Sequence, residues 1–280
     1  MKIYFFLLLC LALVETACSD EKKMAPQMHS VAQIKSLRET YVLTGDATYL
    51  EAILNAVKSD NKEAVFEALF SLQILAPKHR DKIGNEVIIV IGPFLKTDDA
   101  ALLHSVTATV KAYGPFALPV LNDLVAIIKR DASGAAAFSA ETIGEIGVKA
   151  NAAQDVLVDA LYASTLTKEA AIKSLSEVGK LSPNNIDRLR ELIRSSQEEL
   201  NFKLRVAKAL LKNESNNSEA KKILEVAFRD VRSLVKFEAL HIIEDLGLAK
   251  FPWAIPLVEN LALADADRNV RAAAAGLLDK

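Results

Sequence analysis

The amino-acid sequence predicts an all-α fold in which short helices are paired and the pairs are stacked in series. The composition favours helices over sheets, because only 6% of the residues are aromatic and Gly and Pro number 10 and 8 in 280. Apolar residues recur at helical spacing, as in Ala140, Ile143 and Ile146. Such segments end about every 34 residues, which is the length of two short helices and two turns.

The first 17 residues are expected to form a signal peptide. Lys2 gives a positive start, and Ile3 to Val14 is an unbroken apolar run of twelve residues. Twelve helical residues span about 18 Å, against about 30 Å for the hydrocarbon core of a bilayer. The run is therefore too short for a transmembrane helix and has the length of a signal-peptide core. The alternative is a buried first helix in a chain that is not exported.

The segment Val14-Glu15-Thr16-Ala17-Cys18 resembles a bacterial lipobox. The resemblance implies cleavage before Cys18 and lipidation of Cys18, and Ser19 implies an outer-membrane destination. Glu15 departs from the pattern, which has an apolar residue there. The only cysteines of the chain are Cys10 and Cys18, so an acyl anchor is the evident use of Cys18. Plain cleavage, which would give a soluble periplasmic or secreted protein, is the alternative. Residues 18–29 are expected to be a polar tether.

The folded part is expected to occupy residues 30–280. Residues 30–61 are predicted to be N-terminal cap helices, with Thr44-Gly45-Asp46 as their turn. Later helix pairs are predicted to end their first helix at positions 76, 114, 147, 179, 214 and 247, in steps of 38, 33, 32, 35 and 33. Four of these positions are glycines that suit a left-handed C-cap, namely Gly114, Gly147, Gly179 and Gly247. Ala76 and Glu214 are placed by the apolar pattern.

Prolines and capping residues give further boundaries. Pro119 and Pro256 fall in the first turn of a predicted second helix, where the missing N–H costs nothing. Pro93 lies late in an apolar helix and is expected to end or kink it. Ser196 and Glu199 have the spacing of a capping box.

The last part of the chain resembles a HEAT repeat junction. It contains Ala254-Ile255-Pro256-Leu257 followed by Asp267-Arg268-Asn269-Val270-Arg271-Ala272. Asp230-Val231-Arg232 and Leu118-Pro119 repeat parts of this pattern. The resemblance covers residues 62–280 and is strongest to short bacterial HEAT-like repeats. It implies a right-handed α-solenoid of HEAT-like helix pairs, with about six further repeats of which the last is incomplete. The tetratricopeptide repeat fits the period equally well but places its glycine inside the first helix.

The sequence shows no evident catalytic or metal site, and no cofactor is expected. The four histidines are widely spread, and His241 with Glu244 is interpreted as a surface contact. A formal charge of −2 argues against a global electrostatic grip on nucleic acid or anionic membranes. Basic residues do cluster between positions 188 and 212, but interleaved acidic residues indicate a solvated face. Those basic residues are Arg188, Arg190, Arg194, Lys203, Arg205, Lys208 and Lys212.

The expected function is therefore that of a non-catalytic protein-binding or scaffold lipoprotein of the bacterial cell envelope. An immunity or inhibitor protein against an envelope-directed toxin is a specific version. An enzyme of the bilin-lyase or DNA-glycosylase kind is the alternative, and a structural spacer is a third possibility. The expected partner is a protein of unknown identity, with a membrane contact through the lipid anchor and no nucleic acid. Candidate partner-binding residues are Arg188, Arg190, Arg194 and Trp253, the last of which also suits a filler between helix ends.

Overall fold

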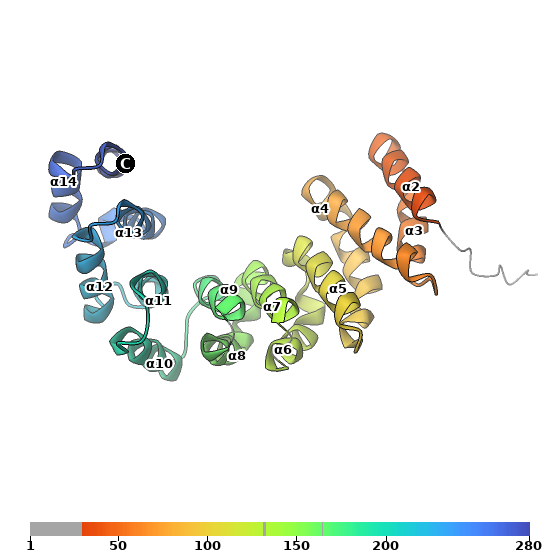
Figure 1. The fold of residues 1–280 in the computed structure, drawn as a ribbon, viewed down its shortest axis with the longest axis horizontal. Helices are drawn as coiled ribbons and strands as arrows, with labels where there is room; N and C mark the ends of the chain where they lie inside the picture. Colours follow the sequence, from red (N-terminus) through yellow and green to blue (C-terminus); the bar gives the residue numbers. More distant parts are fainter. Residues whose placement is uncertain (1–29, 131–132, 164) are drawn as a thin grey trace, which may run out of the picture. The chain divides into compact units, whose positions relative to one another are not determined.

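The structure is a computed structural model that describes residues 30–130, 133–163 and 165–280. Within these ranges all regular elements are helices and no strand occurs (Figure 1). The predicted signal peptide, lipidation site Cys18 and tether lie outside the described residues. None of the described helices is long and apolar enough to cross a membrane. The chain divides into two compact units, one ending at Ala68 and the other comprising Leu69–Lys280.

The N-terminal unit contains a helix pair, α2 (Val31–Thr44) and α3 (Ala47–Ala56). Gly45 ends α2 with a φ of 67°, a left-handed conformation that favours glycine. Asp46 then caps α3 by accepting a 2.9 Å hydrogen bond from the Thr48 amide. The predicted Thr44-Gly45-Asp46 turn is confirmed.

Helix α4 (Lys62–Ile91) contains the boundary between the units. The prediction that a helix ends at Ala76 is wrong, because α4 continues through this residue with Pro77 inside it. Pro77 removes one backbone hydrogen bond, but buried side chains on both sides of it, including Leu75 and Ile83, hold the two halves in place. The helix ends at Ile91, and a 3-10 helix at Gly92–Lys96 contains Pro93. The predicted effect of Pro93 is therefore confirmed.

The C-terminal unit continues as five helix pairs and a last helix, arranged as an α-solenoid. Alternate helices contact one another in series and form two layers (Figure 1). The first layer consists of α5 (Ala100–Ala112), α7 (Ser133–Ile146), α9 (Thr165–Leu175), α11 (Leu200–Asn213), α13 (Ser233–Leu246) and α15 (Arg268–Leu278). The second layer consists of α6 (Leu121–Lys129), α8 (Gln154–Asp159), α10 (Pro183–Arg194), α12 (Ser218–Phe228) and α14 (Ile255–Ala264).

Helices α7 and α13 end directly before Gly147 and Gly247, so these two predicted ends are confirmed. Helix α9 ends at Leu175, four residues before the end predicted at Gly179. Gly147, Gly179 and Gly247 have positive φ values of 71°, 92° and 88°. They let the chain turn toward the second layer in a conformation that other residues resist. Helix α11 ends at Asn213 with Glu214 as its C-cap, so the boundary placed by the apolar pattern is also confirmed.

Two further local predictions are wrong. Gly114 does not adopt the left-handed conformation; it opens the 3-10 helix Gly114–Phe116. Glycine is needed there for a different reason, because a Cβ would collide with the Glu145 side chain of α7. The capping box at Ser196 does not form either. Helix α11 begins at Leu200 with Glu199 as its N-cap, and no side chain caps it.

Candidate binding groove

A groove with a volume of about 640 Å³ lies on the first layer of the C-terminal unit. Its lining residues come from α5, α7, α9, α11 and α13 and from the turn that follows α9. Residues that are far apart in the sequence therefore share one surface. A smaller hollow of about 310 Å³ extends it between α5, α7 and α9 and shares Glu141, Lys173 and Glu177 with it.

The lining follows the repeat. Four residues lie nine positions before the predicted helix ends at 147, 179, 214 and 247; we call them row A, namely Phe138, Ala170, Arg205 and Glu238. Four more lie six positions before the same residues; we call them row B, namely Glu141, Lys173, Lys208 and His241. Every member of both rows lines the groove. Residues three apart share a helix face, so each unit presents one residue of each row.

The floor of the groove is apolar. It is formed by Phe138 and Ala170 of row A together with Leu166 and Ile242. The ring of His104 lies against Phe138, with 5.1 Å between the ring centroids. A Cβ at Gly134 would lie 3.0 Å from the His104 ring, so the missing side chain leaves room for this contact. Two of the four histidines of the chain, His104 and His241, therefore line the groove.

The walls are tied together by ion pairs between neighbouring first-layer helices. Arg205 of α11 pairs with Glu169 of α9 and, at 3.1 Å, with Glu238 of α13. Lys208 pairs with Asp245 at 2.7 Å. Two further wall carboxylates pair with lysines just outside the main groove: Glu141 with Lys111, and Glu177 with Lys212 at 3.3 Å. Exposed pairs of this kind contribute about 0–1 kcal/mol each, so their main effect is to fix side-chain positions.

Lys173 is the exception among the lining charges. It is exposed and lies where the large and small hollows meet. In the described part of the chain no carboxylate pairs with it, whereas each of the other lining Lys, Arg, Asp and Glu side chains has an ion-pair partner. Its charge is available to a ligand.

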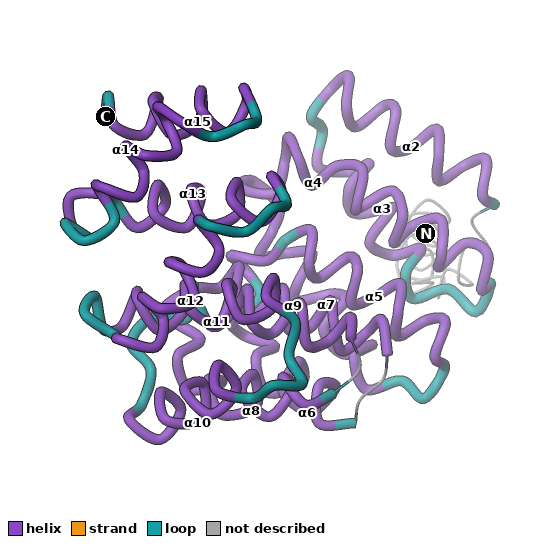
Figure 2. Tube along the Cα trace, turned by 60° about the vertical axis from the view of Figure 1, so that its left-hand side comes forward, coloured by secondary structure: helices purple, strands orange, loops and turns teal. Residues whose placement is uncertain are grey.

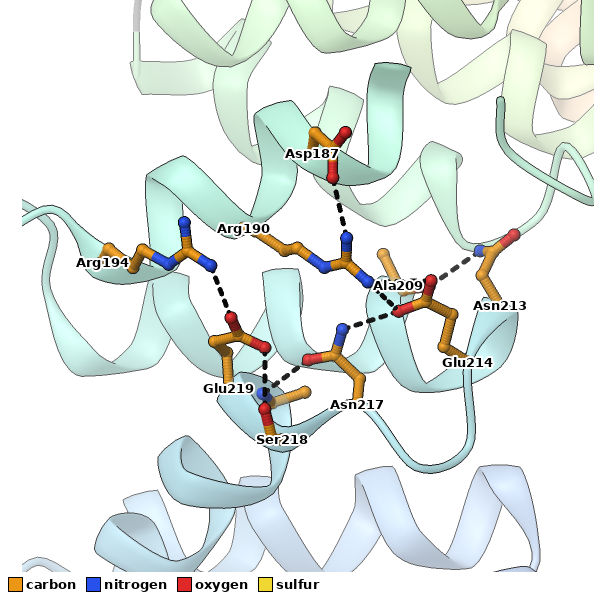
Figure 3. Close-up of polar contacts among 10 residues, drawn as sticks. Asp187, Arg190, Arg194, Ala209, Asn213, Glu214, Asn217, Ser218 and Glu219 are labelled. Atoms are coloured by element: carbon orange, nitrogen blue, oxygen red, sulfur yellow. Dashed lines mark hydrogen bonds and ion pairs between the residues drawn. The ribbon is translucent and has the colours of Figure 1, made fainter. Parts of the chain in front are cut away.

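The predicted partner-binding arginines lie outside this groove, on α10 of the second layer (Figure 3). Arg190 donates to Asp187 at 2.7 Å and to both carboxylate oxygens of Glu214, at 2.7 and 2.9 Å. The hydrogen bond with Asp187, followed by that with Glu214, raises the pKa of Arg190. Arg194 donates to Glu219 at 2.6 Å, which lowers the pKa of Glu219 to about 2. The bonds to Glu214 and Glu219 tie α10 to the end of α11 and to the start of α12.

Arg188 and Trp253 are also engaged within the chain. Arg188 pairs with Asp159 at 2.8 Å and lies 5.9 Å from the centroid of the Tyr162 ring. Trp253 is half-buried, packs edge-on against Phe251 and has the Lys221 ammonium 5.5 Å above its ring. A role of these four residues in partner binding stays a prediction.

The sequence interpretation did not identify the groove. Arg205 and Lys208 were assigned to a solvated face, and His241 to a surface contact with Glu244, which the structure has at 3.1 Å. Aligning the sequences of the units on their predicted helix ends would have shown that rows A and B recur on one face. Among the described residues, no group of three or more His, Cys, Asp and Glu could hold a metal ion.

Comparisons with known proteins concern the fold alone. No family model matches the chain, and no curated protein sequence does. The crystal structure of an engineered protein is similar at 17% identity, covering 82% of this chain and 94% of that one with a TM-score of 0.45. An archaeal HEAT-like repeats protein from Thermococcus onnurineus NA1 is similar at 13% identity, covering 88% and 91% with a TM-score of 0.40.

Proposed function

We propose that this chain is a non-catalytic binding protein of the bacterial cell envelope, anchored by a lipid on Cys18, whose groove holds a segment of a partner protein. The observation that carries the proposal is the construction of the groove. Successive units supply its apolar floor and charged walls from equivalent positions. Solenoids bind extended partners through such distributed surfaces, and a hollow of about 640 Å³ accommodates several side chains.

The unpaired charge of Lys173 suits a peptide segment that places an acidic residue next to apolar ones. The floor around Phe138 and Leu166 offers apolar contact area. Lys173 offers an unpaired ammonium beside it, and an acidic side chain of the partner would give that ammonium a counter-ion. An envelope-directed toxin is one such partner, in which case the chain would be an immunity or inhibitor protein.

Photo-crosslinking tests the groove. The full chain would carry a photoreactive amino acid at Ala137, which lines the groove, and in a matched control at Val148, which is exposed just after α7. We expect a discrete crosslinked protein from position 137 and none from position 148. Lys173→Glu should reduce the yield at position 137, because it removes the free positive charge. Equal products from both positions, or no effect of Lys173→Glu, would contradict the proposal.

The anchor is tested separately. The mass of the N-terminal peptide of the protein isolated from bacterial membranes should equal that of a peptide beginning with an acylated Cys18. Cys18→Ser should move the protein out of the outer-membrane fraction. An unmodified Cys18 would reject the anchor while leaving the groove untouched.

A further inference from the structure

Two neighbouring turns of the C-terminal unit carry large aliphatic side chains that are almost completely exposed. Val231 and Leu234 lie in the turn from α12 to α13 and at the start of α13, with exposures of 95% and 81%. Leu263 lies at the end of α14, beside the turn to α15, with an exposure of 85%. Exposure of single apolar side chains is ordinary, but three large exposed side chains on neighbouring turns indicate a contact surface.

The two turns are held together by polar contacts. The Lys236 ammonium lies 2.5 Å from Asp265 Oδ2, and the Ser233 hydroxyl donates to the Asp267 carboxylate. Figure 2 shows the turns as two teal segments, one beside α13 and the other beside α15. Three exposed aliphatic residues therefore belong to these two joined turns, and we call them the aliphatic edge: Val231, Leu234 and Leu263.

The carboxylates of these turns are engaged within the protein. Asp230 accepts hydrogen bonds from Arg232 at 2.9 Å, which lowers its pKa to about 2. The Asp265 side chain is only 4% exposed. Asp267 caps α15 by accepting from the Asn269 amide at 2.8 Å. None of the three is directed at a ligand as a free negative charge.

The arginines of the same turns, unlike the carboxylates, are exposed. Arg229 and Arg268 are exposed, and neither has an ion pair with any other residue that the structure describes. Arg232 binds Asp230 but is itself more than half exposed. Arg229 and Arg268 are therefore the unpaired charges of these two turns, which contain equal numbers of Arg and Asp. The exposed Glu199, which precedes α11, lies close enough to interact with Arg232.

We propose that the aliphatic edge docks onto an anionic phospholipid surface. Val231, Leu234 and Leu263 would enter the boundary between headgroups and acyl chains, and Arg229 and Arg268 would bind lipid phosphates. Protruding aliphatic side chains flanked by unpaired guanidinium groups suit the apolar and anionic parts of such a surface at the same time. A tether at the N-terminus alone leaves the domain free to rotate, whereas contact through this edge fixes its orientation. The inference goes beyond the proposed function and does not depend on the groove.

Site-specific fluorescence can test this contact, because the only native cysteines are Cys10 and Cys18. A polarity-sensitive fluorophore would be attached to the full chain at Leu234→Cys or Leu263→Cys. The matched control is Val148→Cys, at 69% exposure and just beyond the C-terminal end of α7. Vesicles of phosphatidylcholine with phosphatidylglycerol would be added to each protein. We expect a blue shift and quenching by spin-labelled lipid at 234 and 263, and neither at 148.

Two comparisons make the result decisive. The parent chain without an added cysteine gives the background from Cys10 and Cys18, and every variant shares the same N-terminus, so membrane binding by that end cancels. Arg229→Glu together with Arg268→Glu should abolish the blue shift at 234, while Arg→Lys at both positions should preserve it. No blue shift at 234, an equal one at 148, or a shift that requires an added protein partner would overturn the proposal.

Discussion

Two neighbouring contacts within the first layer are built in different ways. Helices α7 and α9 pack closely through small residues, since Ser174 Oγ lies 2.7 Å from the Ala140 carbonyl oxygen and a Cβ at Gly144 would lie 2.7 Å from Ser174 Oγ. Helix α9 and the turn after it are instead joined to α11 by long charged side chains, as in Glu169–Arg205 and Glu177–Lys212. Close packing sets the distance between the backbones of α7 and α9, whereas ion pairs between long side chains leave open space above the apolar floor of the groove. The groove needs both.

The comparison predicts where substitutions are most costly. Interior packing is dense enough that one added methyl group is felt, whereas exposed ion pairs are weak and screened by salt. The three predictions below follow from this difference and run from the largest expected effect to the smallest.

Gly144→Val should destabilise the protein by about 3 kcal/mol, because the added side chain would meet Ser174 atoms, including its Cα at 3.1 Å. Urea unfolding followed by circular dichroism gives the free energy of unfolding. Gly276→Ala in α15 is the matched control, since a Cβ there meets nothing within 4 Å. It should stabilise by about 0.5–1 kcal/mol through helix propensity. The same sign of change at both glycines would refute the close-packed contact.

Arg205→Ala should lower the free energy of unfolding by about 1 kcal/mol at low salt, because Glu169 and Glu238 both lose their partner. The loss should shrink as salt is added. Lys173→Ala, one unit earlier and without an ion pair, should change stability by less than about 0.5 kcal/mol at any salt concentration. Equal losses for the two variants would show that the ion pairs of the groove do not hold the helices.

Arg194→Ala should move the pKa of Glu219 from about 2 back toward 4.5, because the hydrogen bond from Arg194 is the largest cause of its lowering. A carboxyl group with a depressed folded-state pKa contributes stability above its unfolded pKa and loses it as the pH falls through the folded value. The variant should therefore lose less stability than the parent between pH 4.5 and 2. Because Arg194 is largely exposed, we expect a difference of at most about 1 kcal/mol. Parallel stability curves over this range would contradict the assignment.

The sequence was sufficient for the fold class and for most first-layer boundaries, because these depend on local chemistry. Gly147 and Gly247 end helices with a positive φ that glycine favours, and the apolar spacing up to Glu214 marks a buried face. The sequence gives the same signal at Gly114 as at these glycines, but the missing side chain of Gly114 instead leaves room for the Glu145 side chain. A tertiary contact of that kind has no local signature. The helix end predicted at Ala76 was wrong for a similar reason, because packing on both sides of Pro77 lets α4 continue.

The groove could not be predicted from the sequence of any single helix. Alternating charges on one helix indicate a solvated face, and only stacking shows that Arg205 lies between Glu169 and Glu238. The arginines of α10 stand out in the sequence, and their role in partner binding stays a prediction. They form a conspicuous cluster in sequence, yet each is paired with a carboxylate of the same unit or of a neighbouring one.

The spacing of rows A and B also predicts which backbone amides would exchange more slowly when a ligand occupies the groove. Members of row B are separated by 32, 35 and 33 residues, as their numbers 141, 173, 208 and 241 show. A ligand lying along the groove would contact a short segment of each first-layer helix and would not contact the second-layer helix that follows it in the sequence. Slowed amide exchange would then recur once per repeat along the chain, and the number of protected segments would count the units that the ligand crosses.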